Sequence, residues 1–400
     1  MVHAQPQRHG ENGSGFRVLV RDAIISLGII IAGVPTILLF LVIRRLRSSQ
    51  EIPFKEDFHR SLIRGLSILP VRTIRWHLKH PTASSILVSN RFKNSIDQLC
   101  VRVSAAACEG YWICQGPPGN LQTPKESDVI LLWMHGGAYC FGSPLDAAVT
   151  LLRVAEIVAT RGVSISIFSV DYTLAPTAVF PCQQLESVAA YRHLLDVENI
   201  KPAKIVVAGD SAGGHLALTC LMALSQENLP KPAGALLLWP WINLRNSSPS
   251  FEQNENKDML NKKLLDRCTE LATGVATNAG STEIDVMNLT RPLRNELTWK
   301  RILPAQTWIN VGAHDLFVHD IKTFVQQAKA SGASVDLEVT GGMPHGWQLT
   351  VDKLSEHSYR NLDPTDEVLD GMMQGSANVA EGLLTLLDHG NIGHTRETLA

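Results

Sequence analysis

The sequence predicts an α/β fold: a doubly wound, mostly parallel sheet with a helical cap, preceded by one apolar helix near the N-terminus. After about residue 127, short apolar runs alternate with helix-like stretches. Most of these runs are continuously apolar, which is typical of strands covered by helices on both faces. Strand–helix alternation implies right-handed crossovers and hence a doubly wound sheet. The 400 residues, 45% of them hydrophobic, suffice for one large domain with additions.

The strand candidates are Val129–Met134, Val163–Val170, Lys204–Ala208, Ala235–Trp239, Gln306–Val311 and Val335–Val339. The helix candidates are Asp146–Ala159, Leu185–Leu195, Gly214–Ser225 and Asp320–Ala330, with Asp366–Leu387 as a closing helix. The polar stretch 245–300 interrupts this alternation between two expected core strands. An insertion at the carboxyl edge of a parallel sheet lies over the ligand crevice, so we expect it to form part of a lid or cap.

The N-terminal segment from Ala23 to Ile43 carries no charge. About 21 helical residues span about 30 Å, the thickness of a bilayer core. A cleaved signal peptide fits less well, because a polar tail of 22 residues precedes the run and Arg44, Arg45 and Arg47 follow it. A buried soluble helix is disfavoured by the long uncharged run. We therefore expect a retained transmembrane anchor.

The side of the membrane stays open at this stage. More Lys and Arg residues follow the anchor than precede it, which favours a cytosolic position for the domain after the anchor. Acceptor sequons at Asn246 and Asn288, which are glycosylation candidates, favour the opposite side. Residues 58–79 are either a basic amphipathic stretch on the bilayer or, slightly favoured, a helical hairpin broken at Pro70.

These features divide the chain into consecutive parts. They are a polar tail (1–22), the anchor (23–43), a linker with an N-terminal cap or helical region (44–115), a catalytic domain (116–390) with the insertion at about 245–300, and a tail (391–400). The net charge of -2 gives no basic surplus for binding nucleic acid. Seven scattered cysteines argue against a zinc site or a disulfide framework, although one isolated bridge remains open.

The strongest chemical signal is Gly209-Asp210-Ser211-Ala212-Gly213, which directly follows an apolar run and begins a helix-like stretch. A G-x-S-x-G sequence at a strand-to-helix turn forms a nucleophile elbow, with the serine in a strained conformation. Gly209 and Gly213 are needed because a Cβ atom there would collide with the neighbouring strand and helix. The helix N-terminus also favours negative charge. Ser211 is therefore the expected nucleophile.

A second signal, His135-Gly136-Gly137-Ala138-Tyr139, follows the strand candidate Val129–Met134. It matches a glycine-rich loop whose backbone N–H groups stabilise an oxyanion. We expect Gly136, Gly137, Ala138 and Ala212 to shape the oxyanion hole, with the last three as donors. Ala138 replaces the usual third glycine but keeps its N–H group.

A base and an acid should follow the nucleophile in the order serine, acid, histidine. His345 lies just after the last strand candidate, flanked by glycines and a proline, which singles it out among 14 histidines. Asp315 follows the strand candidate Gln306–Val311 and is the expected acid, with Asp320 as the alternative. The acid would hold the imidazole in one tautomer and stabilise its charged form.

These motifs, with Asp171-Tyr172-Thr173-Leu174-Ala175-Pro176 and Met343-Pro344-His345-Gly346-Trp347, occur in an order that resembles the hormone-sensitive-lipase family of α/β-hydrolases over residues 115–390. Thr173 and Thr177 replace that family's usual Arg and Glu at positions that are mainly structural. The resemblance implies the triad Ser211, Asp315 and His345. With the preceding anchor, the chain is similar to the branch containing arylacetamide deacetylases and fungal steryl acetyl hydrolases, which implies the endoplasmic reticulum and its lumen.

The expected chemistry is two-step hydrolysis of an apolar ester through an acyl-enzyme, with no metal or organic cofactor. The anchor favours a membrane-partitioned small-molecule substrate, and Trp239-Pro240-Trp241 is expected to line an apolar pocket. A short acyl group such as acetyl, on a lipid, sterol or secondary metabolite, follows from the resemblance. Amide hydrolysis by the same triad is one alternative. A non-catalytic receptor is the other, disfavoured because His345 is present. No obligate protein partner is evident.

Overall fold

The structure is a computed structural model. It describes residues 28, 33–47, 52–78, 80–105, 108–120, 122–274, 286–291, 293 and 297–390. The chain forms two compact units, which divide between His77 and Leu78.

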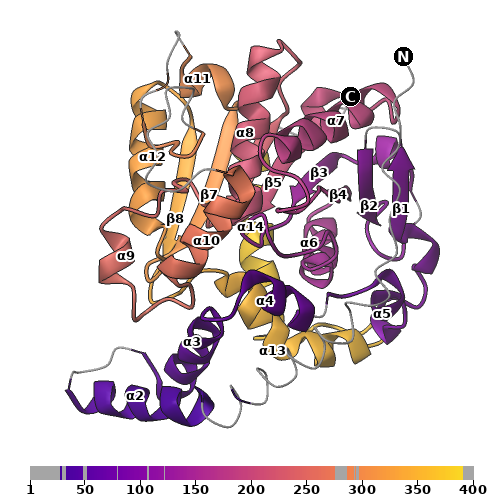
Figure 1. The fold of residues 1–400 in the computed structure, drawn as a ribbon. Coiled ribbons are helices and arrows are strands. Elements are labelled where there is room, and N and C mark those ends of the chain that lie inside the picture. The colour runs from indigo at the N-terminus through magenta and orange to yellow at the C-terminus, as the bar shows by residue number, and fades with distance from the viewer. Residues whose placement is uncertain are drawn as a thin grey trace, which may run out of the picture. The chain divides into compact units, whose positions relative to one another are not determined.

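The C-terminal unit is built on an eight-stranded sheet formed by the described residues (Figure 1). The strand order is β1-β2-β4-β3-β5-β6-β7-β8, and the pairs from β4 to β8 are parallel. The strands are β1 (Leu99–Ala105), β2 (Cys108–Cys114), β3 (Val129–Met134), β4 (Ile165–Val170), β5 (Ile205–Asp210), β6 (Gly234–Leu238), β7 (Gln306–Gly312) and β8 (Val335–Thr340). The six predicted strands are therefore present, with no end shifted by more than two residues.

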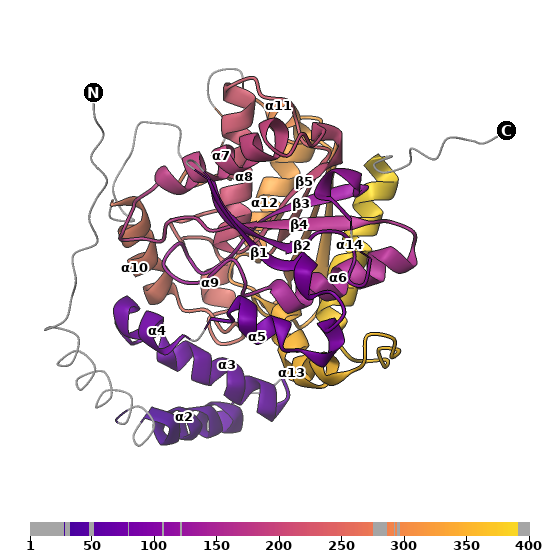
Figure 2. The ribbon, with the colours of Figure 1, turned by 90° about the vertical axis from the view of Figure 1, so that its right-hand side faces the viewer.

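Helices cover both faces of this sheet. α6 (Ala148–Thr160) and α14 (Gln374–Gly390) pack together on one face, and α7 (Cys182–Asp196), α8 (Ala212–Gln226) and α12 (Val318–Ala330) lie on the other (Figure 2). Every residue of β3, β4 and β5 is buried as a result. This explains their continuously apolar sequences, because both faces of each strand contact helices.

The remaining described helices of this unit are α5 (Ala83–Leu87), α9 (Ser250–Gln253), α10 (Lys262–Thr273), α11 (Trp299–Ile302) and α13 (Trp347–Asn361). The predicted closing helix differs from the structure, in which it begins at Gln374 instead of Asp366. All seven cysteines are free, so the isolated disulfide left open by the sequence is not formed.

Strand order reverses at β3, which pairs with β4 on one side and with β5 on the other. The loops that leave the carboxyl ends of β3 and β5 therefore diverge at a crevice, the usual ligand position in open α/β sheets. The glycine-rich loop follows β3 and the predicted nucleophile follows β5. The topology thus brings both motifs to the same crevice.

The structure corrects the predicted start of the catalytic domain at residue 116. β1 and β2 precede that residue, yet they form an antiparallel hairpin that pairs with β4 in the same sheet. Sequence analysis missed them because β1 is half-exposed, so its apolar and polar residues alternate instead of forming a continuous apolar run. The sheet therefore extends into the region that was expected to be linker and helices.

The N-terminal unit contains α2 (Val34–Arg47), α3 (Phe54–Leu66) and α4 (Val71–His77). α2 packs on α3, and the carboxylate of Asp57, which is completely buried, accepts hydrogen bonds from Arg44 and Arg45. The break between α3 and α4 falls at Pro70, as expected for a helical hairpin.

Within the described residues, no helix combines the length and the apolarity needed to cross a bilayer. Most of the first half of the predicted anchor lies outside the described residues, and its second half is helical in α2. The anchor therefore stays a prediction.

Candidate active site

Ser211 occupies a tight turn between β5 and α8, as the elbow motif predicts. Its backbone has φ 53° and ψ -119°, a strained conformation for a non-glycine residue. Two backbone hydrogen bonds hold this conformation, from Ser211 N–H to the carbonyl of Leu238 and from Trp241 N–H to the carbonyl of Ser211, both 2.9 Å. The neighbouring strand β6 and the segment after it thus fix the serine at the crevice.

The glycines of the elbow are required by close packing. A Cβ atom at Gly209 would lie 2.5 Å from the carbonyl oxygen of Gly213. At Gly213 it would collide with the carbonyl oxygens of Met134 and His135, where β3 gives way to the glycine-rich loop. The glycines therefore allow the two loops to approach each other directly, as the sequence predicted.

His345 links the two other residues of the predicted triad. Its Nε2 lies 2.9 Å from Ser211 Oγ, and its Nδ1 lies 2.9 Å from Asp315 Oδ2. With Nδ1 protonated and donating to the carboxylate, Nε2 is left to accept the hydroxyl proton of the serine. The structure therefore brings Ser211, His345 and Asp315 together in the expected order.

Of the two candidate acids, Asp315 reaches the site and Asp320 does not. Asp315 is completely buried, and its second carboxylate oxygen accepts the N–H of Phe317 at 2.8 Å. The carboxylate of Asp320 instead accepts hydrogen bonds from Asn243 (3.1 Å) and Ser248 (2.7 Å). Asp320 therefore holds the segment after β6, and the preference for Asp315 agrees with the geometry.

The loop after β3 carries three consecutive residues with positive φ: Gly137 at 109°, Ala138 at 52° and Tyr139 at 61°. Only Gly137 is a glycine among the three, and a Cβ atom there would collide with the carbonyl oxygen of Phe141. Successive residues in such conformations turn neighbouring N–H groups toward one concave side, which suits an anion. Ala138 thus adopts the required backbone conformation although it replaces a glycine.

Gly136 has a different part in this loop. Its N–H donates to Asp210 Oδ1 at 2.8 Å, so this group is not available to an oxyanion. Burial raises the pKa of Asp210 to about 7, an effect opposed by this hydrogen bond and by the nearby imidazole of His345. Gly136 and Asp210 therefore tie the glycine-rich loop to the elbow.

The segment that begins at Asp171 supports the glycine-rich loop from behind. The Tyr172 hydroxyl donates to the carbonyl of His135 at 2.7 Å, and the two rings stack with centroids 4.2 Å apart. The N–H of Ala175 donates to the carbonyl of Tyr139 at 2.9 Å. Thr173, one of the departures from the family pattern, is held by Glu186 through its N–H and its hydroxyl. The motif thus has a structural role.

The electrostatics of the site favour the charged form of His345. Burial lowers the pKa of this imidazole, but the charge of Asp315 and its hydrogen bond, followed by the charges of Asp258 and Asp210, raise it above the ordinary value. An imidazole in this environment can accept a proton and keep it while an intermediate forms.

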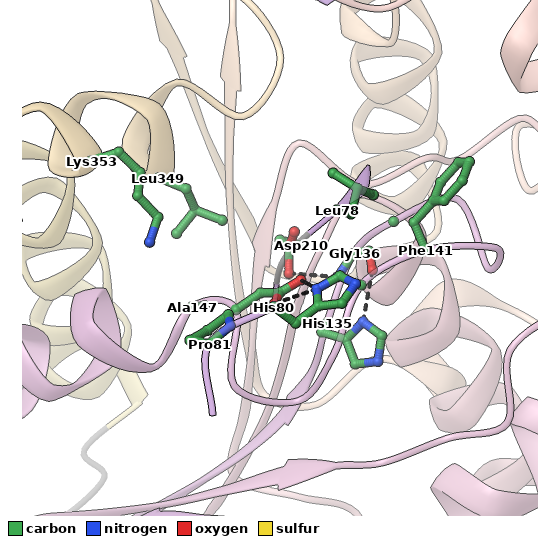
Figure 3. A pocket seen from close by; sticks show the side chains of 13 residues that line it. Leu78, His80, Pro81, His135, Gly136, Phe141, Ala147, Asp210, Leu349 and Lys353 are labelled. Carbon is green, nitrogen blue, oxygen red and sulfur yellow. Dashed lines mark hydrogen bonds and ion pairs between the residues drawn. The ribbon is translucent and has the colours of Figure 1, made fainter. Parts of the chain in front are cut away.

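A cavity of about 360 Å³ adjoins the glycine-rich loop and the elbow (Figure 3). Its lining is mostly apolar, and it includes Gly136, Gly137 and Asp210 from the two loops. Its polar lining residues include His80 and Asp146, and His80 Nδ1 lies 2.9 Å from the carboxylate of Asp146. Its other lining residues are Leu78, Pro81, His135, Phe141, Gly142, Ala147, Leu349 and Lys353.

The predicted role of Trp239-Pro240-Trp241 as a pocket wall is wrong for this cavity, because none of the three residues lines it. The Trp239 ring packs edge-on to the His345 ring with centroids 5.8 Å apart, and Trp241 stacks on Phe317 at 5.9 Å. Both indoles are fully buried. They support the imidazole and the acid loop instead.

The two glycosylation candidates differ in accessibility. Asn246 is completely buried, its amide oxygen accepting from Trp241 Nε1 (2.8 Å) and its amide nitrogen donating to Asp266 (2.9 Å). A glycan at Asn246 is incompatible with this packing, so that prediction is wrong for the folded chain. Asn288 is half-buried, and glycosylation there stays a prediction.

Sequence analysis missed the residues that hold the acid loop and the histidine loop. Asn254 and Asp258 lie in the insert (residues 245–300) and hydrogen-bond to the backbone around Asp315, Leu316 and His345. Neither belongs to a recognisable motif, and both are separated from their partners by more than fifty residues of chain. No local sequence signal marks such contacts.

Comparison with known proteins agrees with this architecture. Residues 131–349 match the family described as alpha/beta hydrolase fold, which is more than half of the chain. An acetyl-hydrolase of Streptomyces hygroscopicus is 28% identical over 242 residues, which are 58% of this chain and 76% of that protein. The arylacetamide deacetylase-like 3 protein of Mus musculus is 30% identical over 160 residues, 38% of each chain.

Among solved structures, an esterase described as belonging to the bacterial hormone-sensitive lipase family superposes with a TM-score of 0.58 at 26% identity. The match covers 82% of this chain and 98% of that one. The chain therefore belongs to the alpha/beta hydrolase fold family, and within it to the hormone-sensitive-lipase group of serine hydrolases.

Proposed function

We propose that the protein hydrolyses a carboxylic ester of an apolar alcohol with a short acyl group such as acetyl, through Ser211, His345 and Asp315. The observation that carries this proposal is the pair of hydrogen bonds made by His345, to Ser211 Oγ and to Asp315, each 2.9 Å. A serine hydroxyl beside an oriented imidazole is a nucleophile with its general base in place.

In the proposed reaction, His345 Nε2 takes the proton of Ser211 as Oγ attacks the ester carbonyl. The N–H groups of Gly137, Ala138 and Ala212 stabilise the oxyanion of the tetrahedral intermediate. The protonated imidazole then gives its proton to the departing alcohol. A water molecule, activated by the same imidazole, hydrolyses the acyl-enzyme and restores the serine.

The preference for a short acyl group and an apolar alcohol is supported by two observations. The adjoining cavity, at about 360 Å³, is near the lower end of the range for small-molecule sites and is mostly apolar. The relative from Streptomyces hygroscopicus is named an acetyl-hydrolase. A lipid, a sterol or a secondary metabolite would supply such an alcohol.

The direct test is hydrolysis of p-nitrophenyl esters from acetyl to palmitoyl by the detergent-solubilised chain and by its Ser211→Ala variant. We expect turnover of acetyl and butyryl esters that falls by about 10⁴-fold or more in the variant. A matched acetanilide separates ester from amide hydrolysis. Absence of both turnover and fluorophosphonate labelling of Ser211 in the folded chain would reject the proposal.

We also propose that residues 23–43 hold the protein at a membrane, with the endoplasmic reticulum as the site and its lumen as the side of the catalytic domain. Supporting this, the described half of the segment exposes Leu38, Leu39, Phe40, Val42 and Ile43. The test is extraction of membranes at alkaline pH. Retention in the pellet that is lost on deletion of residues 23–43 supports an anchor, and release of the intact chain contradicts it. Protease protection of sealed microsomes reports the side.

A further inference from the structure

The first part of the insert is bound to the loop that carries Asp315. Ser250 Oγ donates to the carbonyl of Leu316 at 2.5 Å. The Asn254 amide nitrogen donates to the carbonyls of Ala313 (3.1 Å) and Asp315 (2.9 Å). This segment therefore holds the backbone of the acid loop from outside the sheet.

Asp258, in the same segment, contacts both loops that complete the site. It is completely buried. Its Oδ2 accepts the N–H of Leu316 at 2.7 Å, and its Oδ1 accepts the N–H of His345 at 3.0 Å. The N–H of Met259 also lies 2.6 Å from Oδ1. One carboxylate thus joins the loop after β7 to the loop after β8.

We propose that Asp258 is a positioning residue for ester hydrolysis: its buried carboxylate clamps the backbones at Leu316 and His345 together, and its charge stabilises the protonated imidazole. This inference rests on the proposed function, because it assigns a role within that reaction. Asp258 touches neither substrate nor reacting atoms, so it acts through His345 and the acid loop.

The clamp explains how two separate loops keep a fixed distance. Asp315 and His345 leave different strands, β7 and β8. Their side chains must stay within hydrogen-bond reach while the imidazole exchanges protons with substrate and serine. Shared backbone hydrogen bonds to one carboxylate restrict the relative motion of the two loops, and misplacement by about 1 Å can cost about 10²-fold in rate.

The charge of Asp258 gives this role a distinct signature. Burial, with the neighbouring charge of Asp315, raises the pKa of Asp258 to about 6, while His345 and the N–H groups of Leu316 and His345 oppose the rise. Above that pH the carboxylate is charged and raises the pKa of His345, as Asp315 and Asp210 do. Removing the charge of Asp258 therefore lowers the pKa of His345. The acid limb of the pH profile, where activity is lost as the pH falls, then moves to lower pH.

The experiment compares Asp258→Asn with wild type on p-nitrophenyl butyrate, counting active enzyme by fluorophosphonate titration so that loss of folded protein is not read as loss of kcat. We expect kcat to fall about 10- to 100-fold, KM to change little, and the acid limb of kcat/KM to move to lower pH. Asn254→Ala, which loosens the acid loop without removing a charge, should lower kcat and leave the acid limb in place.

Asp352→Asn is the matched control, because this buried aspartate accepts the N–H groups of Gly375 (2.7 Å) and Ser376 (3.0 Å) and the hydroxyl of Thr150 (2.9 Å), none of which belongs to the triad. We expect a lower melting temperature with unchanged kcat and pH profile. An unshifted acid limb in Asp258→Asn, or a kcat no lower than that of Asp352→Asn, overturns the proposal.

Should Asp258→Asn yield no folded protein, the Asp258→Glu variant tests the positioning role in its place. It keeps the charge but displaces the oxygens, so kcat should fall while the acid limb stays, and an unaltered kcat rejects the clamp. If the wild-type chain turns over no ester, the proposed function fails separately. The role of Asp258 is then measured by the rate and pH dependence of fluorophosphonate labelling of Ser211.

Discussion

The two halves of the candidate site are held by different kinds of contact. On one side, the elbow at Ser211 and the loop at Gly137 meet through glycines and backbone packing, with strands β3 and β5 paired directly beneath them. On the other side, the loops carrying Asp315 and His345 are joined by polar side chains of the insert, chiefly Asn254 and Asp258. In the first half, the glycines leave no room for a Cβ atom. The second half depends on hydrogen bonds from the insert, which is distant in sequence.

This difference bears on how each half responds to mutation. A Cβ atom added at the elbow meets backbone that cannot move without breaking the sheet. A side chain lost from the insert leaves the loops connected but less well aligned. We therefore expect defects of the first half to be structural, and defects of the second to appear in kcat and its pH dependence.

The largest effect is expected for Asp315→Asn, which keeps the shape of the side chain but removes the charge that orients and stabilises His345. We expect kcat to fall by about 10⁴-fold, measured with p-nitrophenyl butyrate. Asp320→Asn is the control, since that carboxylate hydrogen-bonds to Asn243 and Ser248 in the segment after β6. A comparable loss in Asp320→Asn would mean that the acid is wrongly assigned.

Gly213→Ala tests the elbow half. The added Cβ would press on the carbonyls of Met134 and His135, displacing the oxyanion loop from Ser211. We expect kcat/KM to fall by about 10²- to 10³-fold, the cost of losing an oxyanion donor, together with a lower melting temperature. Gly341→Ala, in the loop after β8, has open space around the new atom and should stay near wild type. Equal losses of kcat/KM in Gly213→Ala and Gly341→Ala would contradict the view that close backbone packing is specific to the elbow half of the site.

The pH profile tests the second half. His345 must be neutral to accept the proton of Ser211, and its pKa lies above the ordinary 6.5 because of the surrounding carboxylates. Activity should therefore be present at higher pH and be lost as the pH falls through a midpoint above 6.5. A midpoint of kcat/KM below pH 6.5 would show that burial lowers the pKa of His345 by more than the carboxylates raise it.

The smallest effect is expected for Tyr172→Phe, which removes the hydroxyl bonded to the His135 carbonyl. The loss should cost about 0.5–1.5 kcal/mol of unfolding free energy, measured by urea denaturation, and a modest part of kcat. Tyr191→Phe removes a similar bond, to the carbonyl of Pro230 at 2.8 Å, away from the site. It should lower stability without lowering kcat, and any equal loss of kcat would argue against a role for Tyr172 in the oxyanion loop.

Much of this protein was determined by local sequence. The parallel strands β3 to β8 were all predicted, and in most of them burial on both faces leaves a continuous apolar run; β8, an edge strand with polar residues, is the exception. Ser211, Gly137 and His345 were predicted because their motifs encode backbone geometry within a few residues. The hairpin β1–β2 was not recognised, because β1 is partly exposed and polar residues interrupt its apolar sequence.

Tertiary structure alone decided the rest. It fixed which carboxylate faces His345: position in the sequence favoured Asp315 over Asp320, and the path of the chain after β7 brings Asp315 to the imidazole while Asp320 bonds to Ser248. It buried Asn246 beside Trp241, where a surface sequon was expected. It also joined Asp258 to loops that lie 58 and 87 residues further along the chain. Contacts at such separations depend on how completed elements pack, and no short stretch of sequence contains that information.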